Sequence, residues 1–108
     1  MSQVNNITNE LVSIRDYLRW GVSEFGRAGL FFGHGTDNAY DESRVLVSHV
    51  LNLPFDFETE LLDARLTIAE RESILSLLER RITERVPAAY LTREAGFAGL
   101  SFYVDERV

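Results

Sequence analysis

The sequence predicts a mainly α-helical protein, in which a small helical bundle is followed by a C-terminal β-hairpin. Three patterns lead to this fold class. Apolar residues recur every three or four positions between Ile7 and Phe25, which is the spacing of one helix face. The stretch from Thr67 to Glu70 carries a signal for the start of a helix. Near the end of the chain, apolar and polar residues alternate as they do in a half-buried strand.

The first expected helix runs from Ile7 to Phe25. Gly26 and Gly29 are expected to end it, because glycine readily takes the backbone conformation that follows a helix. Residues 33–38 are then dense in Gly, Asp and Asn, which predicts an ordered loop. The apolar face of this first helix is expected to consist of Ile7, Leu11, Ile14, Leu18, Val22 and Phe25.

A second helix is expected from Asp41 to Leu51. The carboxylate of Asp41 can cap its first turn, and Pro54 stops the helix soon after its last residue. Residues 58–64 are consistent with one short helical turn before the next helix.

The longest expected helix begins with a capping box at Thr67 and Glu70. In this motif the hydroxyl accepts a hydrogen bond from the third backbone amide, and the glutamate reaches back to the capping residue. The helix is expected to run to Val86, because a proline such as Pro87 disfavours helical geometry in the residue before it. Its buried face should hold Ile68, Leu75, Leu78, Ile82 and Val86. The core of the bundle should contain Leu11, Leu18, Leu46, Val50, Leu75, Leu78 and Ile82.

The tail is expected to form the hairpin. Residues 94–97 would be one strand, and residues 100–104, where Leu, Phe and Val alternate with Ser and Tyr, would be the other. We therefore divide the chain into a helical domain, residues 1–92, and a β-hairpin linker, residues 93–108. A lone hairpin is marginally stable in water, so it should pack on the helices or on a further domain.

The charge of the chain favours a basic partner. The net charge is −6, and all 11 basic residues are arginine. Residues 1–64 hold 4 arginines against 10 acidic residues, whereas residues 65–108 hold 7 of each. Nucleic-acid binding depends on neutralising phosphates with Lys and Arg, so direct binding to nucleic acid is not expected. A negative surface attracts a basic protein instead.

Several classes of protein are excluded by composition. The chain has no cysteine, which rules out disulfides, thiolate metal ligands and a cysteine nucleophile. No apolar run approaches the ~20 residues that a membrane-spanning helix needs, and the start of the chain lacks a signal-peptide pattern. We therefore expect a protein of the reducing cytoplasm that is not embedded in a membrane.

No catalytic, cofactor-binding or metal-binding residue is expected in this chain. The two histidines, His34 and His49, cannot make a zinc site without further ligands, and His49 is expected to be a structural residue of the second helix. No serine lies at a turn from strand to helix, as a nucleophile would. Gly33 and Gly35 do not follow a strand, so they do not form a phosphate-binding loop.

The candidate binding site is the loop of residues 33–38 with Trp20 beside it. The loop is either a simple turn or a set of hydrogen-bonding groups for a partner protein. Trp20 lies off the main apolar stripe, so it either packs in the core or anchors a partner. Arginines 80, 81 and 85 alternate with glutamates and are expected on a solvated helix face. The candidate recognition residues are Trp20, Gly33, His34, Gly35, Thr36, Asp37 and Asn38.

Two segments of the tail carry a family resemblance. The stretch Pro87-Ala88-Ala89-Tyr90-Leu91-Thr92 and residues 97–108 resemble the segment that joins the two domains of the HemK-type protein-glutamine methyltransferases. The loop of residues 33–38, together with Leu18-Arg19-Trp20, resembles one branch of this family. The members of that branch methylate a glutamine of the third large-subunit ribosomal protein.

The resemblance implies that this chain is the N-terminal substrate-recognition domain of such an enzyme. The family holds S-adenosylmethionine, together with an Asn-Pro-Pro-Tyr motif, in a catalytic domain that follows. The motif is absent here, because the only prolines are Pro54 and Pro87. The implied partners are a basic ribosomal protein and the enzyme's own catalytic domain, and the chain alone should be inactive.

Two other functions stay open at this stage. The chain could be a free-standing helical domain that binds other proteins. It could also be the N-terminal part of a DNA adenine methyltransferase, a class that shares the Asn-Pro-Pro-Tyr chemistry. The acidic first half counts against the DNA enzyme.

Overall fold

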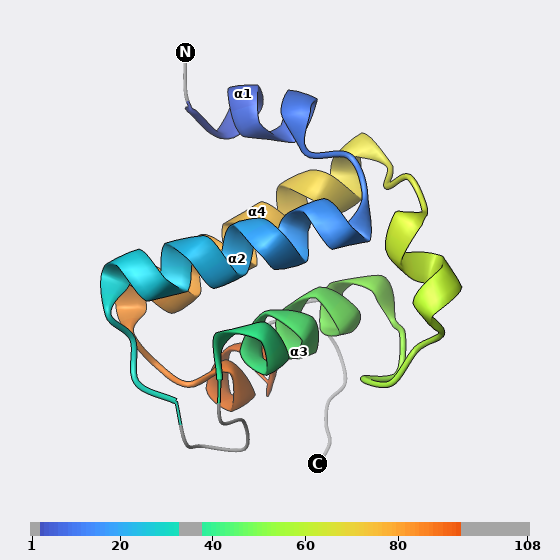
Figure 1. Cartoon of the computed structure of the whole chain (residues 1–108). Coiled ribbons are helices and arrows are strands. Elements are labelled where there is room, and N and C mark those ends of the chain that lie inside the picture. Colours follow the sequence, from blue (N-terminus) through green and yellow to red (C-terminus); the bar gives the residue numbers. More distant parts are fainter. Residues whose placement is uncertain (1–2, 33–37, 94–108) are drawn as a thin grey trace.

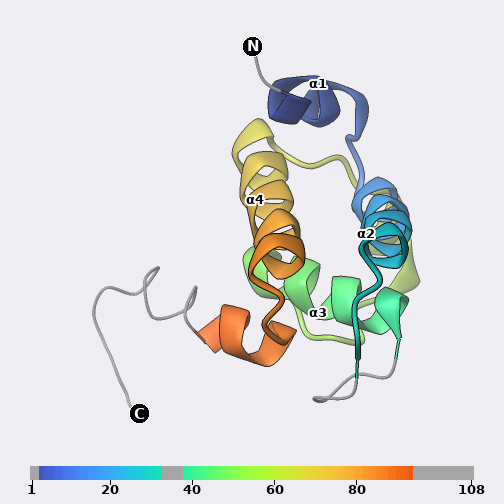
Figure 2. The same ribbon diagram turned by 90° about the vertical axis from the view of Figure 1, so that its left-hand side faces the viewer.

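The described part of the chain is built from helices. The structure is a computed structural model that describes residues 3–32 and 38–93, with side chains from residue 7 onward. Its elements are α1 (Gln3–Glu10), α2 (Ile14–Ala28), α3 (Ala39–Leu51), the short 3₁₀ helix η1 (Thr59–Asp63) and α4 (Ile68–Glu84). Residues 88–93 form a further helical segment. Figures 1 and 2 show α2 beside α4 and α3 crossing both of them. Helix α1 lies near the start of α4, at the end away from α3.

The first predicted helix is divided in two by the structure. Ser13 caps α2 through a capping box, in which its hydroxyl accepts from the backbone N–H of Asp16 at 3.1 Å. The Asp16 carboxylate accepts in turn from the amides of Ser13 and Val12. The backbone N–H of Leu66 also donates to the Val12 carbonyl, at 2.8 Å. The bonds of Ser13 and Asp16 satisfy amides that a new helix start leaves open, so the chain turns between α1 and α2.

Three of the helices end where the next residue takes a left-handed backbone conformation. Gly29, at φ 65°, ends α2 as predicted, whereas Gly26 lies inside the helix. Asn52, at φ 60°, ends α3. The capping box of Thr67 and Glu70 is confirmed at the start of α4. That helix stops at Glu84, two residues before its predicted end, because Arg85 takes a left-handed conformation at φ 56°.

The predicted fold class is wrong in its second part. Within residues 3–32 and 38–93 every regular element is helical, and extended pairing is limited to an isolated bridge between Ser13 and Arg65. Arg93, which we assigned to the hairpin linker, is helical and is the last described residue of the segment 88–93. The other residues of the predicted hairpin, 94–104, lie outside the described residues. The boundary between a domain of residues 1–92 and a linker of residues 93–108 stays a prediction.

Burial explains why the chain is helical after Pro87. The Pro87 carbonyl accepts hydrogen bonds from the amides of Tyr90 and Leu91, at 3.0 and 3.3 Å. The helical turn places Ala88 and Leu91 on one side, where both are buried in the core. Proline is well suited to a helix start, since its missing N–H has no partner there in any case.

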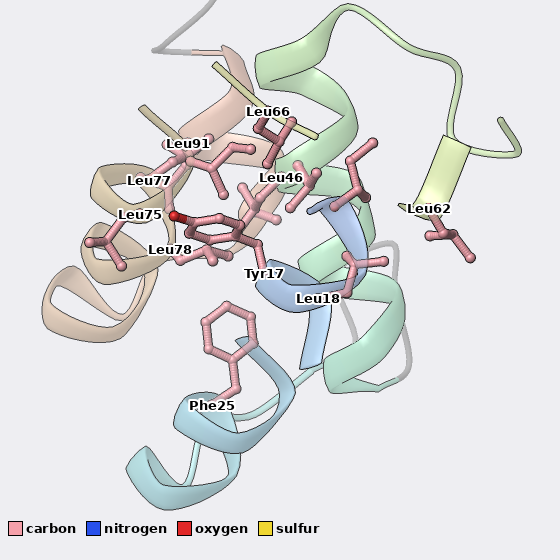
Figure 3. Packing of buried hydrophobic residues seen from close by; sticks show 14 of the residues in the cluster. Tyr17, Leu18, Phe25, Leu46, Leu62, Leu66, Leu75, Leu77, Leu78 and Leu91 are labelled. Atoms are coloured by element: carbon pink, nitrogen blue, oxygen red, sulfur yellow. The ribbon is translucent and has the colours of Figure 1, made fainter. Parts of the chain in front are cut away.

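The core lies where α2, α3 and α4 meet. Figure 3 shows the ring of Tyr17 pointing from α2 toward Leu75 and Leu78 of α4. Of the predicted core residues, four are buried: Leu18, Leu46, Leu75 and Leu78. Three are only partly buried: Leu11, Val50 and Ile82. Phe25, predicted on the apolar face of the first helix, is fully buried, and so are Tyr17, Ile74 and Leu91, which were not predicted.

The buried face of α4 differs from the predicted one at its first turn, as Ile68 shows. Its side chain is exposed, although the spacing placed it on the buried side. Arg71 lies inside instead and donates to the carbonyls of Leu66 and Thr8, at 3.1 and 3.0 Å. Because one guanidinium binds both carbonyls, Arg71 joins α1 to the start of α4.

Candidate functional site

The described end of the predicted recognition loop is Asn38, which caps α3. Its side-chain oxygen accepts from the backbone N–H of Asp41 at 2.8 Å, and its side-chain nitrogen donates to the Asp41 carboxylate at 3.2 Å. The prediction that Asp41 is the capping residue is therefore wrong, since it lies in the first turn. The other loop residues, Gly33, His34, Gly35, Thr36 and Asp37, lie outside the described residues.

Trp20 is partly buried against the core and lines an open hollow. The hollow has a volume of about 540 Å³ and lies where α1, α2 and α4 come together. The sequence left two alternatives for Trp20, packing in the core or anchoring a partner. In the structure the side chain packs on the core and also faces an open space. The other described recognition residue, Asn38, lies at the start of α3, and no residue of α3 belongs to the described lining of this hollow. We call this space the Trp20 hollow; its lining residues are Ile7, Trp20, Glu24, Glu79, Ile82 and Thr83.

The Trp20 hollow combines apolar and acidic side chains. Ile7, Trp20 and Ile82 pack against the core, and Glu24 and Glu79 add two carboxylates from α2 and α4. Glu24 forms an ion pair with the exposed guanidinium of Arg27, one turn further along the same helix. Within the described part of the chain, the Glu79 carboxylate has no ion-pair or hydrogen-bond partner. The described lining of the hollow therefore contains two carboxylates and no basic residue.

The acidic residues of the hollow were not predicted. A partial signal exists, because Glu24 follows Trp20 by four residues and therefore shares its helix face. Likewise Ile82 and Thr83 follow Glu79 by three and four residues on α4. The meeting of the two faces could not be read from the sequence, because it depends on how α2 and α4 pack.

A second, smaller hollow of about 210 Å³ lies between α2, α3 and η1. It is lined by Leu18, Val22, Tyr40 and Leu62, with the arginines Arg15 and Arg19 beside them. Arg15 binds Asp63 of η1 at 2.9 Å. The hydrogen bond to Asp63, together with the charge of this carboxylate, raises the pKa of Arg15. The described lining of this hollow contains two arginines, one of them paired with Asp63, and no carboxylate, in contrast to the Trp20 hollow.

Arg44 organises a third surface, where aromatic rings are exposed. Its guanidinium carbon lies 3.9 Å from the ring centroid of Phe57 and 5.8 Å from that of Phe55. It also donates to the carbonyls of both residues and to the Tyr40 hydroxyl. Its donors are thus used within the protein, and the cluster fixes the chain that follows α3.

Few described side chains have a pKa that departs from its ordinary value. Burial lowers the pKa of His49, which is half-buried on α3. Burial also raises the pKa of Tyr17 to about 12. In the described ranges no three His, Cys, Asp or Glu side chains lie close enough to hold a metal ion. No described helix has the length and apolar composition needed to cross a membrane.

Comparison with known proteins shows close relatives of this chain. It is 56% identical over 104 residues to the "Ribosomal protein uL3 glutamine methyltransferase" of Neisseria meningitidis serogroup A, which covers 96% of this chain and 34% of that protein. The protein of the same name from Neisseria gonorrhoeae is also 56% identical over 104 residues, or 35% of its length. The protein of that name from Burkholderia pseudomallei is 57% identical over 96 residues, covering 89% of this chain and 31% of that protein.

The resemblance found in the sequence is therefore confirmed. This chain spans about a third of the length of these relatives and matches their N-terminal part. No protein-family profile matches the chain. No solved structure matches it either.

Proposed function

We propose that this chain is the N-terminal, substrate-binding part of an enzyme that methylates a glutamine side chain of ribosomal protein uL3. The observation that carries this proposal is the identity to the first third of enzymes that bear that name. Identity at this level over nearly the whole chain is consistent with the same fold and the same role.

The chemistry itself is assigned to the part of the enzyme that this chain does not cover. Such a methyltransferase takes its methyl group from S-adenosylmethionine. We therefore assign no step of methyl transfer to the described residues.

The proposed task of this chain is to hold the substrate protein near the catalytic domain. Ribosomal proteins are generally basic, and the net charge of −6 favours the capture of such a partner. The loop of residues 33–38 and Trp20 remain the proposed recognition residues, because they carry the resemblance to this branch of the family. Within the loop, the Asn38 side chain caps α3 and is bound to Asp41, so we propose that the other loop side chains contact the substrate. The enzyme's own catalytic domain is the second proposed partner. The cytoplasm, where ribosomal proteins are made, is the proposed location.

The test compares three proteins: the full-length enzyme, this chain alone, and the enzyme without residues 1–93. The full-length enzyme should add one methyl group to a glutamine of uL3, as measured by mass spectrometry of the protein digest. The chain alone should neither methylate uL3 nor bind S-adenosylmethionine in a calorimetric titration. The shortened enzyme should still bind S-adenosylmethionine but lose most of its activity on uL3. Full activity of the shortened enzyme would contradict the proposed role of this chain.

A further inference from the structure

We propose that the Trp20 hollow binds a basic segment of the substrate protein, with a lysine or arginine side chain over the Trp20 indole and the carboxylates of Glu24 and Glu79 as counter-charges. This inference rests on the proposed function and adds a site and a ligand chemistry to it.

The size and lining of the hollow suit such a side chain. A volume of about 540 Å³ falls within the usual range for binding pockets, roughly 300–1,000 Å³. Lysine and arginine carry apolar stems that can pack on Ile7 and Ile82, while their charged ends reach polar groups. The face of an indole attracts cations more strongly than other aromatic rings do. Trp20 therefore offers a cation a favourable surface beside an apolar one.

The carboxylates of the hollow are open to a new partner. Glu24 is paired with Arg27, whose side chain is 69% exposed. An exposed pair of this kind contributes little to stability, so the Glu24 carboxylate can exchange its partner at low cost. No partner for the Glu79 carboxylate is found in the described part of the chain. The two carboxylates come from different helices, which allows them to bind one cation from two directions.

Hydrogen bonds within the protein hold parts of the walls of the hollow. The guanidinium of Arg71 on α4 donates to the Thr8 carbonyl of α1, next to Ile7. The Thr83 hydroxyl donates to the backbone carbonyl of Glu79, at 3.0 Å. A site that is already ordered loses less entropy when it binds, which favours affinity.

The other described surfaces suit a basic partner less well. The described lining of the smaller hollow contains Arg19 and Arg15, the latter already paired with Asp63, and offers a basic partner no carboxylate. The cluster around Arg44 uses its donors within the protein. Among the three surfaces, only the Trp20 hollow combines an aromatic face with negative charge in the described residues.

Fluorescence of Trp20 gives a direct test, because this is the only tryptophan in the chain. Short overlapping peptides of uL3 are titrated into the chain, and the emission of Trp20 is followed. Basic peptides should change the emission, and the effect should weaken with added salt as screening increases. The variant Glu24→Gln with Glu79→Gln should bind the best peptide about tenfold less tightly, since both counter-charges are lost.

The matched control is Glu58→Gln with Glu60→Gln. It removes the same total charge from exposed positions at η1, outside the hollow, and should bind the peptide as the unmodified chain does. Both double variants should melt at the same temperature as the unmodified chain. Equal loss in the two variants would show that only net charge matters and would overturn the proposal. An emission change caused by the separate catalytic domain, and not by uL3 peptides, would also overturn it.

The same variants in the full-length enzyme separate this inference from the proposed function. Glu24→Gln with Glu79→Gln should raise the KM for uL3 about tenfold, with the loss appearing in KM more than in kcat. If the unmodified enzyme methylates uL3 and this variant does so equally well, only the inference is wrong. If the unmodified enzyme does not methylate uL3, the proposed function fails and the inference fails with it.

Discussion

The guanidinium of Arg81 and the carboxylate of Glu42 form an ion pair in the interior, between α4 and α3. Both side chains are at least 96% buried. Arg81 also donates to the carbonyl of Phe31 at 2.9 Å, and the same Glu42 carboxylate accepts from the amide of Ala88 at 3.1 Å. This pair therefore joins α3, α4, the chain after α2 and the segment after Pro87.

Removing one partner of this pair should destabilise the protein strongly. Arg81→Leu leaves the Glu42 carboxylate buried without its counter-charge, which typically costs about 3–5 kcal/mol. The free energy of unfolding, measured in urea, should fall by this amount. A domain of this size has only about 5–15 kcal/mol of stability, so the variant should be close to unfolding.

Two further variants check the cause of this loss. Arg81→Leu combined with Glu42→Leu should lose less than the sum of the two single losses, because no unpaired charge stays buried. Glu84→Gln breaks the exposed pair of Arg80 and Glu84 and should change the unfolding curve little. Additive losses at residues 42 and 81 would show that the two residues act independently.

The close crossing of α2 and α3 at Gly21 gives a second prediction. A Cβ atom added at Gly21 would lie 2.5 Å from the Oγ atom of Ser43, which is too close for any real contact. Gly21→Ala should therefore destabilise the protein, although alanine is favoured over glycine inside a helix by about 1 kcal/mol. The melting temperature is the simplest measurement.

Ser43 provides the control for this clash. Its buried hydroxyl has no hydrogen-bond partner among the described residues, so Ser43→Ala alone should change stability little. Combined with Gly21→Ala, it should recover part of the lost melting temperature, because the atom that clashes is gone. A rise in melting temperature for Gly21→Ala alone would mean that the helices can separate at no cost.

Local signals predicted several elements correctly. The capping box at Thr67 and the end of α2 at Gly29 depend on residues a few positions apart, so the sequence contains all the information they need. The same kind of signal was missed at Ser13 and Asp16. The apolar spacing continues from Leu11 to Ile14 without interruption, and it hid the break between α1 and α2.

Tertiary contacts account for the larger errors. Arg80, Arg81 and Arg85 look alike in the sequence, and we expected all three in solvent. Arg81 is buried because Glu42, 39 residues earlier in the chain, faces it from α3. The Trp20 hollow was missed for the same reason, since Glu24 and Glu79 come together only when α2 packs on α4. Helical spacing defines a face, but it does not show which face it meets.

His49 should make stability depend on pH. Burial lowers its pKa in the folded protein, whereas an unfolded histidine titrates near ~6.5. Between these two pKa values the unfolded chain binds a proton that the folded protein does not. The stability contributed by the neutral imidazole is therefore present above pH ~6.5 and is lost as the pH falls toward the lower, folded pKa.

Unfolding in urea at about pH 7.5 and about pH 5.5 measures this effect, since the two values lie on either side of the unfolded pKa. The variant His49→Gln should lose less stability between the two conditions than the unmodified chain does. His34→Gln is the matched control, because it removes the other histidine and leaves His49 in place. An equal loss in the unmodified chain and the His49→Gln variant would show that carboxylates alone cause the pH dependence.

The last prediction separates the structural role of Asn38 from recognition by the loop. Asn38 caps α3, so Asn38→Ala should cost about 0.5–2 kcal/mol of stability. Asn38→Ser should keep the cap, because serine is also a good capping residue and its hydroxyl can accept from the Asp41 amide. The serine variant of the full-length enzyme should then methylate uL3 nearly as well as the unmodified enzyme, since the Asn38 amide already binds Asp41.

His34→Ala combined with Thr36→Ala should affect recognition and leave stability unchanged, in contrast to Asn38→Ala. We expect unchanged melting but weaker methylation of uL3, because a partner that used these side chains would be left with unpaired polar groups. Steady-state kinetics of the full-length enzyme measure the effect as a fall in kcat/KM for uL3. If this variant is as active as the unmodified enzyme while Glu24→Gln with Glu79→Gln is impaired, recognition lies in the Trp20 hollow and the loop is only a turn. If the loop variant alone is impaired, the loop recognises uL3 without help from the hollow.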